Sequence, residues 1–151
     1  MNLAEYYNTV IDLSHGIVIT LDEKGRIVHG NAHFERVAGY QIRELAGMDW
    51  FTTFVDEDRR DQARSRFHAI VRAGELTLVK SALRTKSGRT VFVDWNMKPL
   101  FTSSGEVLSV LCVGVDVTAH VERQRLFDLP RSRAERDLEQ WQAIIDWAEA
   151  G

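Results

Sequence analysis

The side chains that could do chemistry in this chain are few, and the first to consider are two histidines. His29 and His33 are four residues apart, which is the spacing that lets two imidazoles on one helix bind the same metal ion. Gly30 and Asn31 stand between them, and both residue types interrupt a continuous helix. The pair therefore predicts no metal site.

Catalytic groups are equally sparse. The neighbours Ser14 and His15 have no acidic residue placed to orient them, and the acidic run 56–58 is typical of a helix start, where carboxylates oppose the helix dipole. The chain lacks the short motifs of α/β-hydrolases, zinc peptidases, P-loop proteins, dinucleotide-binding enzymes and C-x-x-C redox proteins, so we predict no enzyme. The enzymatic alternative is a small cone-shaped α+β isomerase that uses Asp94, although strand alternation turns Asp94 away from Trp95.

Composition and charge argue against two classes of partner. The 151 residues carry a net charge of −3, which gives no attraction to nucleic acid or to an anionic membrane. Four arginines within 59–66 share a helical segment with Asp58 and Asp61, so we expect a solvated face of i, i+3 and i, i+4 ion pairs. No apolar run approaches the roughly 20 residues of a membrane span, and no secretory signal is recognisable, so we expect a cytoplasmic protein.

Hydrophobic periodicity predicts the elements that position these residues. β-branched runs predict strands over 17–21 and 26–29, joined by a tight turn. Asn31 is expected to cap a short helix over 32–38, and a longer helix is expected from the acidic run to residue 72. Short polar turns that end in glycine join three further strands as antiparallel neighbours, over residues 76–84, 90–101 and 107–117.

The last strand is apolar on both sides, so something must cover the outer face of the sheet. The expected cover is an amphipathic N-terminal helix or a second subunit, and the apolar stripe of that helix consists of Leu3, Tyr6, Val10 and Leu13. At the other end, Pro130 breaks the helical region. Beyond it a stripe from Ala134 through Trp141 and Ile145 predicts about two heptads of coiled coil.

A series of short motifs occurs in one order along the chain. They are Gly25-Arg26-Ile27-Val28 before Asn31, Gly39-Tyr40, Glu44-Leu45-Ala46-Gly47, Trp50-Phe51, Thr85-Lys86-Ser87-Gly88-Arg89 before the strand with Trp95, and Gly114-Val115-Asp116-Val117-Thr118. Their order and spacing resemble those of PAS domains, the sensor modules common in bacterial signalling proteins, over residues 16–122.

The resemblance implies an α+β fold with a five-stranded antiparallel sheet and helices on one face. The sensor core would span 16–118, after an N-terminal amphipathic helix over 1–15 and before output or dimerisation helices over 119–151, broken at Pro130. A pocket would lie between the inner face of the sheet and the short helices, with the candidate lining Trp50, Phe54, Phe67, Trp95, Met97 and Leu111. These large apolar side chains would equally fill an ordinary core.

PAS relatives hold flavin, haem, small acids or nothing. The asparagine-cysteine-arginine motif of flavin-adduct photosensors is absent, and Cys112 lies in a strand where we expect a buried, inert thiol. No cofactor, or a non-covalently bound flavin stacked on tryptophan, is the expectation that remains. Haem would need an axial histidine on the longer helix, and His68 stands beside the apolar stripe there, which favours a surface position.

The resemblance predicts a homodimeric sensory domain of the kind found in two-component systems. A ligand, a cofactor state or a partner would bias the sheet, and the signal would pass through Asp116 and Thr118 into the exit helix, which Thr118 is expected to cap. The effector would be another domain or protein, such as a kinase or a cyclic-nucleotide enzyme. A ligand-free dimerisation or protein-interaction module is the alternative.

Overall fold

Five strands form one antiparallel sheet in the spatial order β2-β1-β5-β4-β3. The computed structural model describes residues 2, 5, 9, 16–126 and 133–150, and it places side chains in the last segment from residue 139 onward. The strands are β1 (Ile17–Leu21), β2 (Ile27–Gly30), β3 (Thr77–Arg84), β4 (Thr90–Phe101) and β5 (Val107–Asp116). The predicted five-stranded antiparallel sheet is confirmed, because each predicted strand agrees with an observed one to within one residue at either end.

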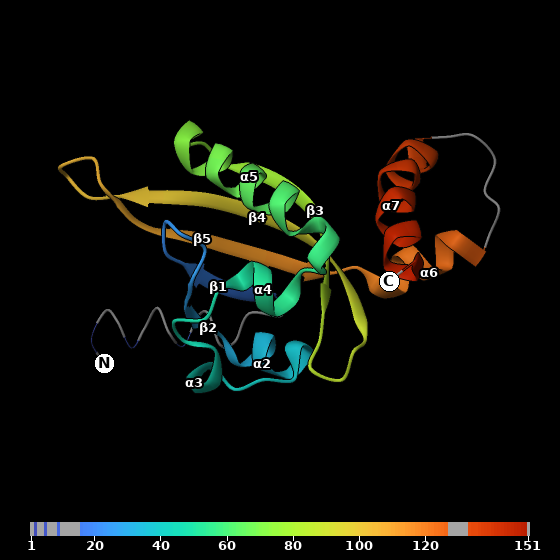
Figure 1. Cartoon of the computed structure of the whole chain (residues 1–151), viewed down its shortest axis with the longest axis horizontal. Coiled ribbons are helices and arrows are strands. Elements are labelled where there is room, and N and C mark those ends of the chain that lie inside the picture. Colours follow the sequence, from blue (N-terminus) through green and yellow to red (C-terminus); the bar gives the residue numbers. More distant parts are fainter. Residues whose placement is uncertain (1, 3–4, 6–8, 10–15, 127–132, 151) are drawn as a thin grey trace.

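Four helices connect β2 to β3 and cover the inner face of the sheet (Figure 1). They are α2 (Ala32–Ala38), α3 (Ile42–Leu45), α4 (Trp50–Phe54) and α5 (Glu57–Ala73). Their aromatic side chains meet in the core: the Phe34 ring lies 5.7 Å from Phe54 and 6.0 Å from Trp50, centroid to centroid. Tilted and edge-on contacts of this kind add to the gain from burying the rings.

Asn31 ties the first of these helices to the sheet. Its side-chain oxygen accepts from the Phe34 amide at 3.0 Å, which caps α2, and from the Val18 amide of β1 at 3.1 Å. Its side-chain nitrogen donates to the Gly16 carbonyl at 3.0 Å. Asn31 is therefore more than a helix cap, because one buried side chain fixes both the start of α2 and the start of β1.

The outer face of the sheet is partly covered from the C-terminal side. Helices α6 (Thr118–Leu126) and α7 (Arg133–Ala150) gather at one end of the sheet (Figure 1). There Trp141 and Ile145 of α7, each 1% exposed, pack against Ala82 of β3, Phe92 of β4 and Val121 of α6. These contacts form a second apolar cluster, which we call the outer cluster.

The outer cluster bears on two predictions. An N-terminal helix was the expected cover of the outer face; Leu3, Tyr6, Val10 and Leu13 lie outside the described residues, as does Pro130, so that expectation stays a prediction, and α7 covers part of the same face. The coiled-coil prediction is wrong for Trp141 and Ile145, because both side chains are buried against the chain's own sheet. None of the helices within 16–126 and 133–150 is long and apolar enough to cross a bilayer.

Candidate ligand cavity and output joint

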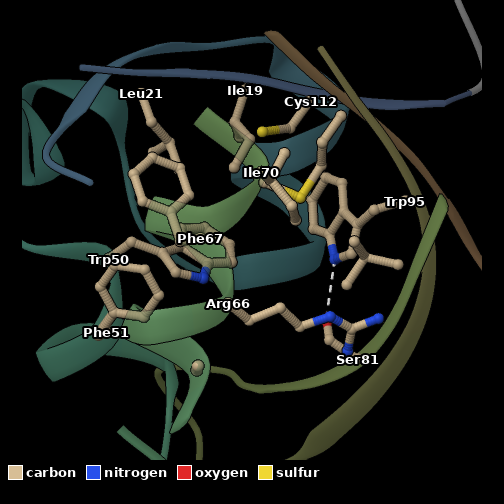
Figure 2. Close-up of a pocket in the computed structure, with 13 residues that line it drawn as sticks. Ile19, Leu21, Trp50, Phe51, Arg66, Phe67, Ile70, Ser81, Trp95 and Cys112 are labelled. Atoms are coloured by element: carbon tan, nitrogen blue, oxygen red, sulfur yellow. Dashed lines mark hydrogen bonds between the residues drawn. The ribbon is translucent and has the colours of Figure 1, made fainter. Parts of the chain in front are cut away.

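A cavity of about 80 Å³ lies between the inner face of the sheet and helices α4 and α5 (Figure 2). Apolar side chains dominate its walls. The lining residues are Ile19, Leu21, Trp50, Phe51, Ala63, Arg66, Phe67, Ile70, Val79, Ser81, Trp95, Met97 and Cys112. Its position between sheet and short helices agrees with the predicted pocket.

Strand register builds the sheet side of the cavity. Cys112 of β5 lies opposite Ile19 of β1 and Met97 of β4, so these three side chains share the inner face. On the other side of β4, Trp95 pairs with Val79 of β3. Since side chains alternate between the two faces of a strand, one residue in two from each of these strands reaches the cavity.

Gly114 allows Trp95 to lie flat against β5. The two residues are direct cross-strand partners, and a Cβ atom at Gly114 would stand 2.6 Å from the indole of Trp95 and 2.6 Å from Val93. Real Cβ contacts are longer than this, so glycine is required by the close approach of the ring. Gly114, the first residue of the motif 114–118, therefore leaves the space in which the Trp95 ring forms part of the cavity wall.

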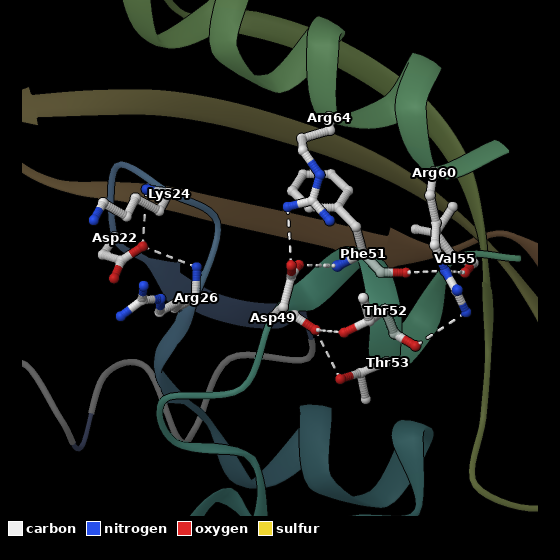
Figure 3. Close-up of polar contacts among 10 residues, drawn as sticks. All are labelled: Asp22, Lys24, Arg26, Asp49, Phe51, Thr52, Thr53, Val55, Arg60 and Arg64. Carbon is white, nitrogen blue, oxygen red and sulfur yellow. Dashed lines mark hydrogen bonds and ion pairs between the residues drawn. The ribbon is translucent and has the colours of Figure 1, made fainter. Parts of the chain in front are cut away.

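The helical side is held by a polar frame around α4 (Figure 3). The Asp49 carboxylate accepts from the Phe51 amide at 2.8 Å, which caps the helix, and pairs with Arg64 of α5 at 2.9 Å. The Arg60 side chain donates to the Val55 carbonyl at 2.9 Å and to the Phe51 carbonyl at 3.2 Å, at the opposite end of α4. No helix was predicted over 50–54, since the capping Asp49 and the donor Arg60 lie on either side of an apolar patch that has no helical periodicity of its own.

Four of the six predicted pocket residues line the cavity: Trp50, Phe67, Trp95 and Met97. Phe54 is buried but lies behind Trp50, against Phe34 and Tyr40. Leu111 is placed on the wrong face by the prediction. It pairs with Thr20 and Lys98, while its neighbour Cys112 points inward.

The polar groups of the cavity come from different elements. The Ser81 hydroxyl of β3 accepts from the Trp95 indole at 2.9 Å. Arg66 of α5, which is exposed to solvent, also lines the cavity and is labelled in Figure 2. Burial raises the pKa of the Cys112 thiol to about 12, so this group stays neutral. Arg66 and Ser81 were not among the predicted pocket residues, because polar residues in an amphipathic pattern are normally expected to face solvent.

The cavity does not fit the cofactors considered from the sequence. An engineered cavity of about 150 Å³ holds benzene, and the cavity of about 80 Å³ here is smaller, so the three-ring system of a flavin does not fit among these side chains. His68 does not line the cavity and packs beside Phe67 with the ring centroids 5.8 Å apart. It is therefore not placed to bind haem iron in the cavity.

Asp116 and Thr118 join β5 to the exit helix through a short network. The Asp116 carboxylate accepts from the Thr118 amide at 3.0 Å and from its hydroxyl at 2.5 Å. The Thr118 hydroxyl in turn accepts from the Phe92 amide of β4 at 3.0 Å. The prediction that Thr118 caps the exit helix is wrong, because the Thr118 hydroxyl oxygen accepts from the backbone of β4 instead. The residue whose amide it accepts from, Phe92, belongs to the outer cluster.

Helix α7 also reaches the wall of the cavity. Arg66 and Ser81, which line the cavity, also line an outer groove of about 180 Å³ together with Ile144 and Trp147 of α7. The Trp147 indole donates to Asp58 of α5 at 3.1 Å. Strand β3 is therefore a thin wall with the cavity on one side and α7 on the other.

The arginines of α5 mostly bridge elements rather than forming the predicted ion pairs along the helix. Arg60 and Arg64 hold α4, and the Arg59 guanidinium lies 5.2 Å from the Trp147 ring centroid of α7. Asp94, the acid of the isomerase alternative, lies on the outer face and pairs with Lys80 at 3.1 Å. It is therefore not a buried acid of the cavity.

An antiparallel sheet closed by short helices over one apolar cavity, with helices leaving the last strand, is the architecture of an α+β sensor domain. The sequence profile of the PAS domain family matches residues 14–119. The chain therefore belongs to the PAS domain family, whose members are generally sensory. Among curated proteins, none matches the chain.

Solved structures of PAS domains share this fold. The PAS domain of the quorum-sensing receptor RpfR from Cronobacter turicensis is 23% identical with a TM-score of 0.60, over 70% of this chain and 96% of that one. A PAS domain from Colwellia psychrerythraea is 15% identical with a TM-score of 0.69, over 78% and 99%. A domain of a sensory box sensor histidine kinase/response regulator from Geobacter sulfurreducens is 17% identical with a TM-score of 0.61, over 75% and 93%.

Proposed function

We propose that this PAS domain detects a small molecule in the cavity and relays its binding to the C-terminal helices. The observation that carries the proposal is the shared wall, because Arg66 and Ser81 line both the cavity and the groove beneath α7. A ligand that displaces this wall changes the surface on which α7 packs. The RpfR domain, which was solved in complex with BDSF and with C12:0, gives a precedent for small-molecule binding by this fold.

The relay would have two arms. One arm runs through β3 into Ile144 and Trp147 of α7, and the other runs through the Asp116–Thr118 network into α6. Both end at the outer cluster, so a ligand needs only to favour one of two packings of this cluster to shift the population of the helices.

The ligand part is tested on protein purified without added ligand. The absorbance spectrum and the native mass are measured, and a small-molecule panel is then screened by thermal shift. A retained mass or a ligand-dependent rise in melting temperature that is lost in the cavity-filling variant Ser81→Leu supports the proposal. A bare native mass and no shift from any compound would favour the alternative of a ligand-free protein-interaction module, which the small cavity also suits.

The relay part is tested at Thr118. Replacement by valine keeps the shape and removes the hydroxyl, so the buried Phe92 amide loses its acceptor, at a cost of about 1–3 kcal/mol. We expect faster hydrogen exchange in 118–126, and a weaker response of α7 to ligand. If exchange of 118–126 is unchanged while the melting temperature falls, Thr118 supports the core and the relay through it is wrong.

We propose further that the domain is a homodimer through the outer face of β5. Val113 and Val115 are 36% and 55% exposed there, and neighbouring apolar side chains on a sheet face favour burial against a second copy. Sedimentation over a dilution series tests this, with Val115→Lys as the disrupting variant and deletion of residues 1–13 as a second. A monomer at high micromolar concentration in every case would contradict it.

The output would act on an effector of the kinase or cyclic-nucleotide-enzyme type. The histidine kinase neighbour motivates the first of these classes. A chimera in which this chain replaces the sensor domain of a PAS-regulated histidine kinase provides the test. Autophosphorylation that responds to the ligand, and no longer responds with Thr118→Val, is the expected result. A constant rate with and without ligand would count against kinase output.

A further inference from the structure

The two edge strands of the sheet, β2 and β3, differ in length and in cover. At the β2 edge the segment before α4 supplies backbone partners: the Ile27 amide donates to the Met48 carbonyl at 2.8 Å, and the Gly47 amide donates to the Ile27 carbonyl at 2.7 Å. Strand β3 is eight residues long against four for β2, and its register with β4 runs over 77–84 without a bulge. Long, regular edge strands of this kind readily pair with a further strand.

The hydrogen-bond pattern shows which backbone groups of β3 face away from β4. The Thr85 amide donates to the Arg89 carbonyl at 2.8 Å, so these two residues form a hydrogen-bonded pair next to the turn. Such pairs alternate along an antiparallel ladder, so Leu78 directs its N–H and C=O to the outer edge. Within the part of the chain that the structure describes, no residue hydrogen-bonds to them, and the Leu78 side chain is 72% exposed.

Two grooves, of about 670 Å³ and about 180 Å³, follow this edge of β3. Both are lined by Arg66 of α5, Lys80 of β3 and Ile144 of α7, so they adjoin and form one trough, which we call the edge trough. Helix α5 is its wall on the inner side of the sheet, and α7 is its wall on the outer side. A strand that pairs with β3 would lie in this trough with its side chains alternately toward α5 and toward α7.

The α5 wall of the edge trough is positively charged. Arg59, Gln62 and Arg66 line it at helical spacing. Arg66 is exposed, and no ion pair or hydrogen bond joins it to another residue in the described ranges. Asp94, which also lines the trough, pairs with Lys80 at 3.1 Å. Since the whole chain carries a net charge of −3, this wall is a local exception that favours acidic side chains on an incoming strand.

A second copy of the chain matches this edge poorly. Two β3 strands would pair antiparallel about a two-fold axis, which keeps both α5 helices on the same face of the joined sheet. The arginine walls of the two copies would then lie side by side, and like charges placed together in an interface are unfavourable. The charge of the trough therefore favours a different polypeptide over a second copy.

From this arrangement we infer that the β3 edge is a docking site for an extended acidic segment of a partner protein, which adds to the five-stranded sheet as a further strand. The backbone of the segment pairs with the N–H and C=O of Leu78. Its acidic side chains face Arg66 and Arg59, and its alternate apolar side chains lie against Leu78 and Ile144. Docking at this edge needs no ligand in the cavity, so it can be tested separately from the proposed function.

A synthetic peptide tests the charge and the strand pairing together. The probe is a capped peptide of about seven residues in which valine alternates with glutamate, titrated into the isotope-labelled full chain at low ionic strength. We expect the amide resonances of 77–82 to shift and hydrogen exchange of the Leu78 amide to slow, because that N–H gains an acceptor. The matched peptide with lysine in place of glutamate should bind about fivefold more weakly.

Substitutions in the chain separate the backbone contribution from the charge. Leu78→Pro removes the N–H that faces the edge without removing a bond of the β3–β4 ladder, and should abolish binding, whereas Leu78→Ala keeps the N–H and should retain it. A glutamate peptide with N-methylated amides makes the same test on the unchanged chain. Arg66→Glu should reverse the preference toward the lysine peptide. Arg72→Glu is its control, because Arg72 is exposed on the same helix and does not line the trough.

Each outcome bears on one part of the inference. Binding that requires the Leu78 N–H, with a charge preference that Arg66→Glu reverses and Arg72→Glu keeps, supports it. Binding that survives both Leu78→Pro and N-methylation overturns the strand pairing, and equal binding of the two peptides overturns the acidic partner. Shifts at 77–82 that grow with protein concentration in the absence of peptide would identify a second copy as the occupant and overturn a separate partner. No binding of either peptide overturns the docking site as a whole.

Discussion

Replacing Trp141 by alanine measures how firmly α7 is held on the sheet. The indole is 1% exposed, lies edge-on to Phe92 with ring centroids 5.7 Å apart, and has the Lys80 ammonium 5.0 Å from its own ring centroid. Truncation of a buried tryptophan costs about 3–5 kcal/mol. The cation–π contact is part of this sum, because it disappears with the ring.

The cost should appear locally rather than in global unfolding. Helix α7 is attached to the sheet by side-chain contacts and takes no part in the strand ladder, so it can open as a separate unit. Since every 1.4 kcal/mol changes an equilibrium constant tenfold, the loss of about 3–5 kcal/mol raises the open fraction of α7 between roughly 140-fold and 3,700-fold.

Hydrogen exchange followed by mass spectrometry resolves this. Amide hydrogens in peptides from 139–150 should exchange faster in proportion to the larger open fraction of α7, whereas peptides from β1 and β4 should keep their exchange rates. Glu139→Ala is the matched control, because Glu139 is exposed on the same helix. Unchanged exchange of 139–150 in Trp141→Ala would refute the reasoning, and an equal acceleration in β1 would mean that α7 unfolds only with the whole domain.

Three further predictions concern the core. Asn31→Ala should lower the free energy of unfolding by about 2–4 kcal/mol in chemical denaturation, because two buried amides lose their acceptor; Asn31→Asp keeps the acceptor and should cost less, and equal costs would contradict this. Gly114→Ala should cost about 1–3 kcal/mol and shift the Trp95 indole resonance, and an unshifted resonance would exclude the predicted displacement of the ring. Burial raises the pKa of Cys112 from 9.0 to about 12, so the thiol contribution is intact below pH 9 and declines as the pH rises toward 12; an unfolding free energy whose pH dependence over this range is the same in Cys112→Ser would argue against it.

The sequence was sufficient for most of the fold because local signals and tertiary packing agree. β-Branched runs with glycine-ended turns yielded all five strands, and Asn31 marked the start of α2. Helix α4 was missed, since a five-residue helix has almost no periodicity and depends on Asp49 before it and Arg60 after it. Asp49 is the residue directly before the helix, whereas the Arg60 contacts come from the next helix and are not reported by local propensity.

The site was only partly predictable. Size and hydrophobicity identified Trp50, Phe67, Trp95 and Met97, but they could not fix which face of β5 points inward, and Leu111 was assigned to the wrong one. A strand that is apolar on both faces carries no alternation to decide its register. Periodicity found the stripe on α7, but a stripe looks the same whether its partner is a second helix or the chain's own sheet.

The outer cluster has a practical consequence for work with shorter versions of the chain. The family match ends at residue 119, a natural place to truncate, yet Phe92 and Ala82 owe their burial partly to Trp141 and Ile145 beyond it. A fragment of 14–119 would present these side chains to water beside Val115 on the same face. We therefore expect it to self-associate at concentrations where the full chain does not, so an oligomeric state measured on the fragment would report the cut surface rather than the intact sensor.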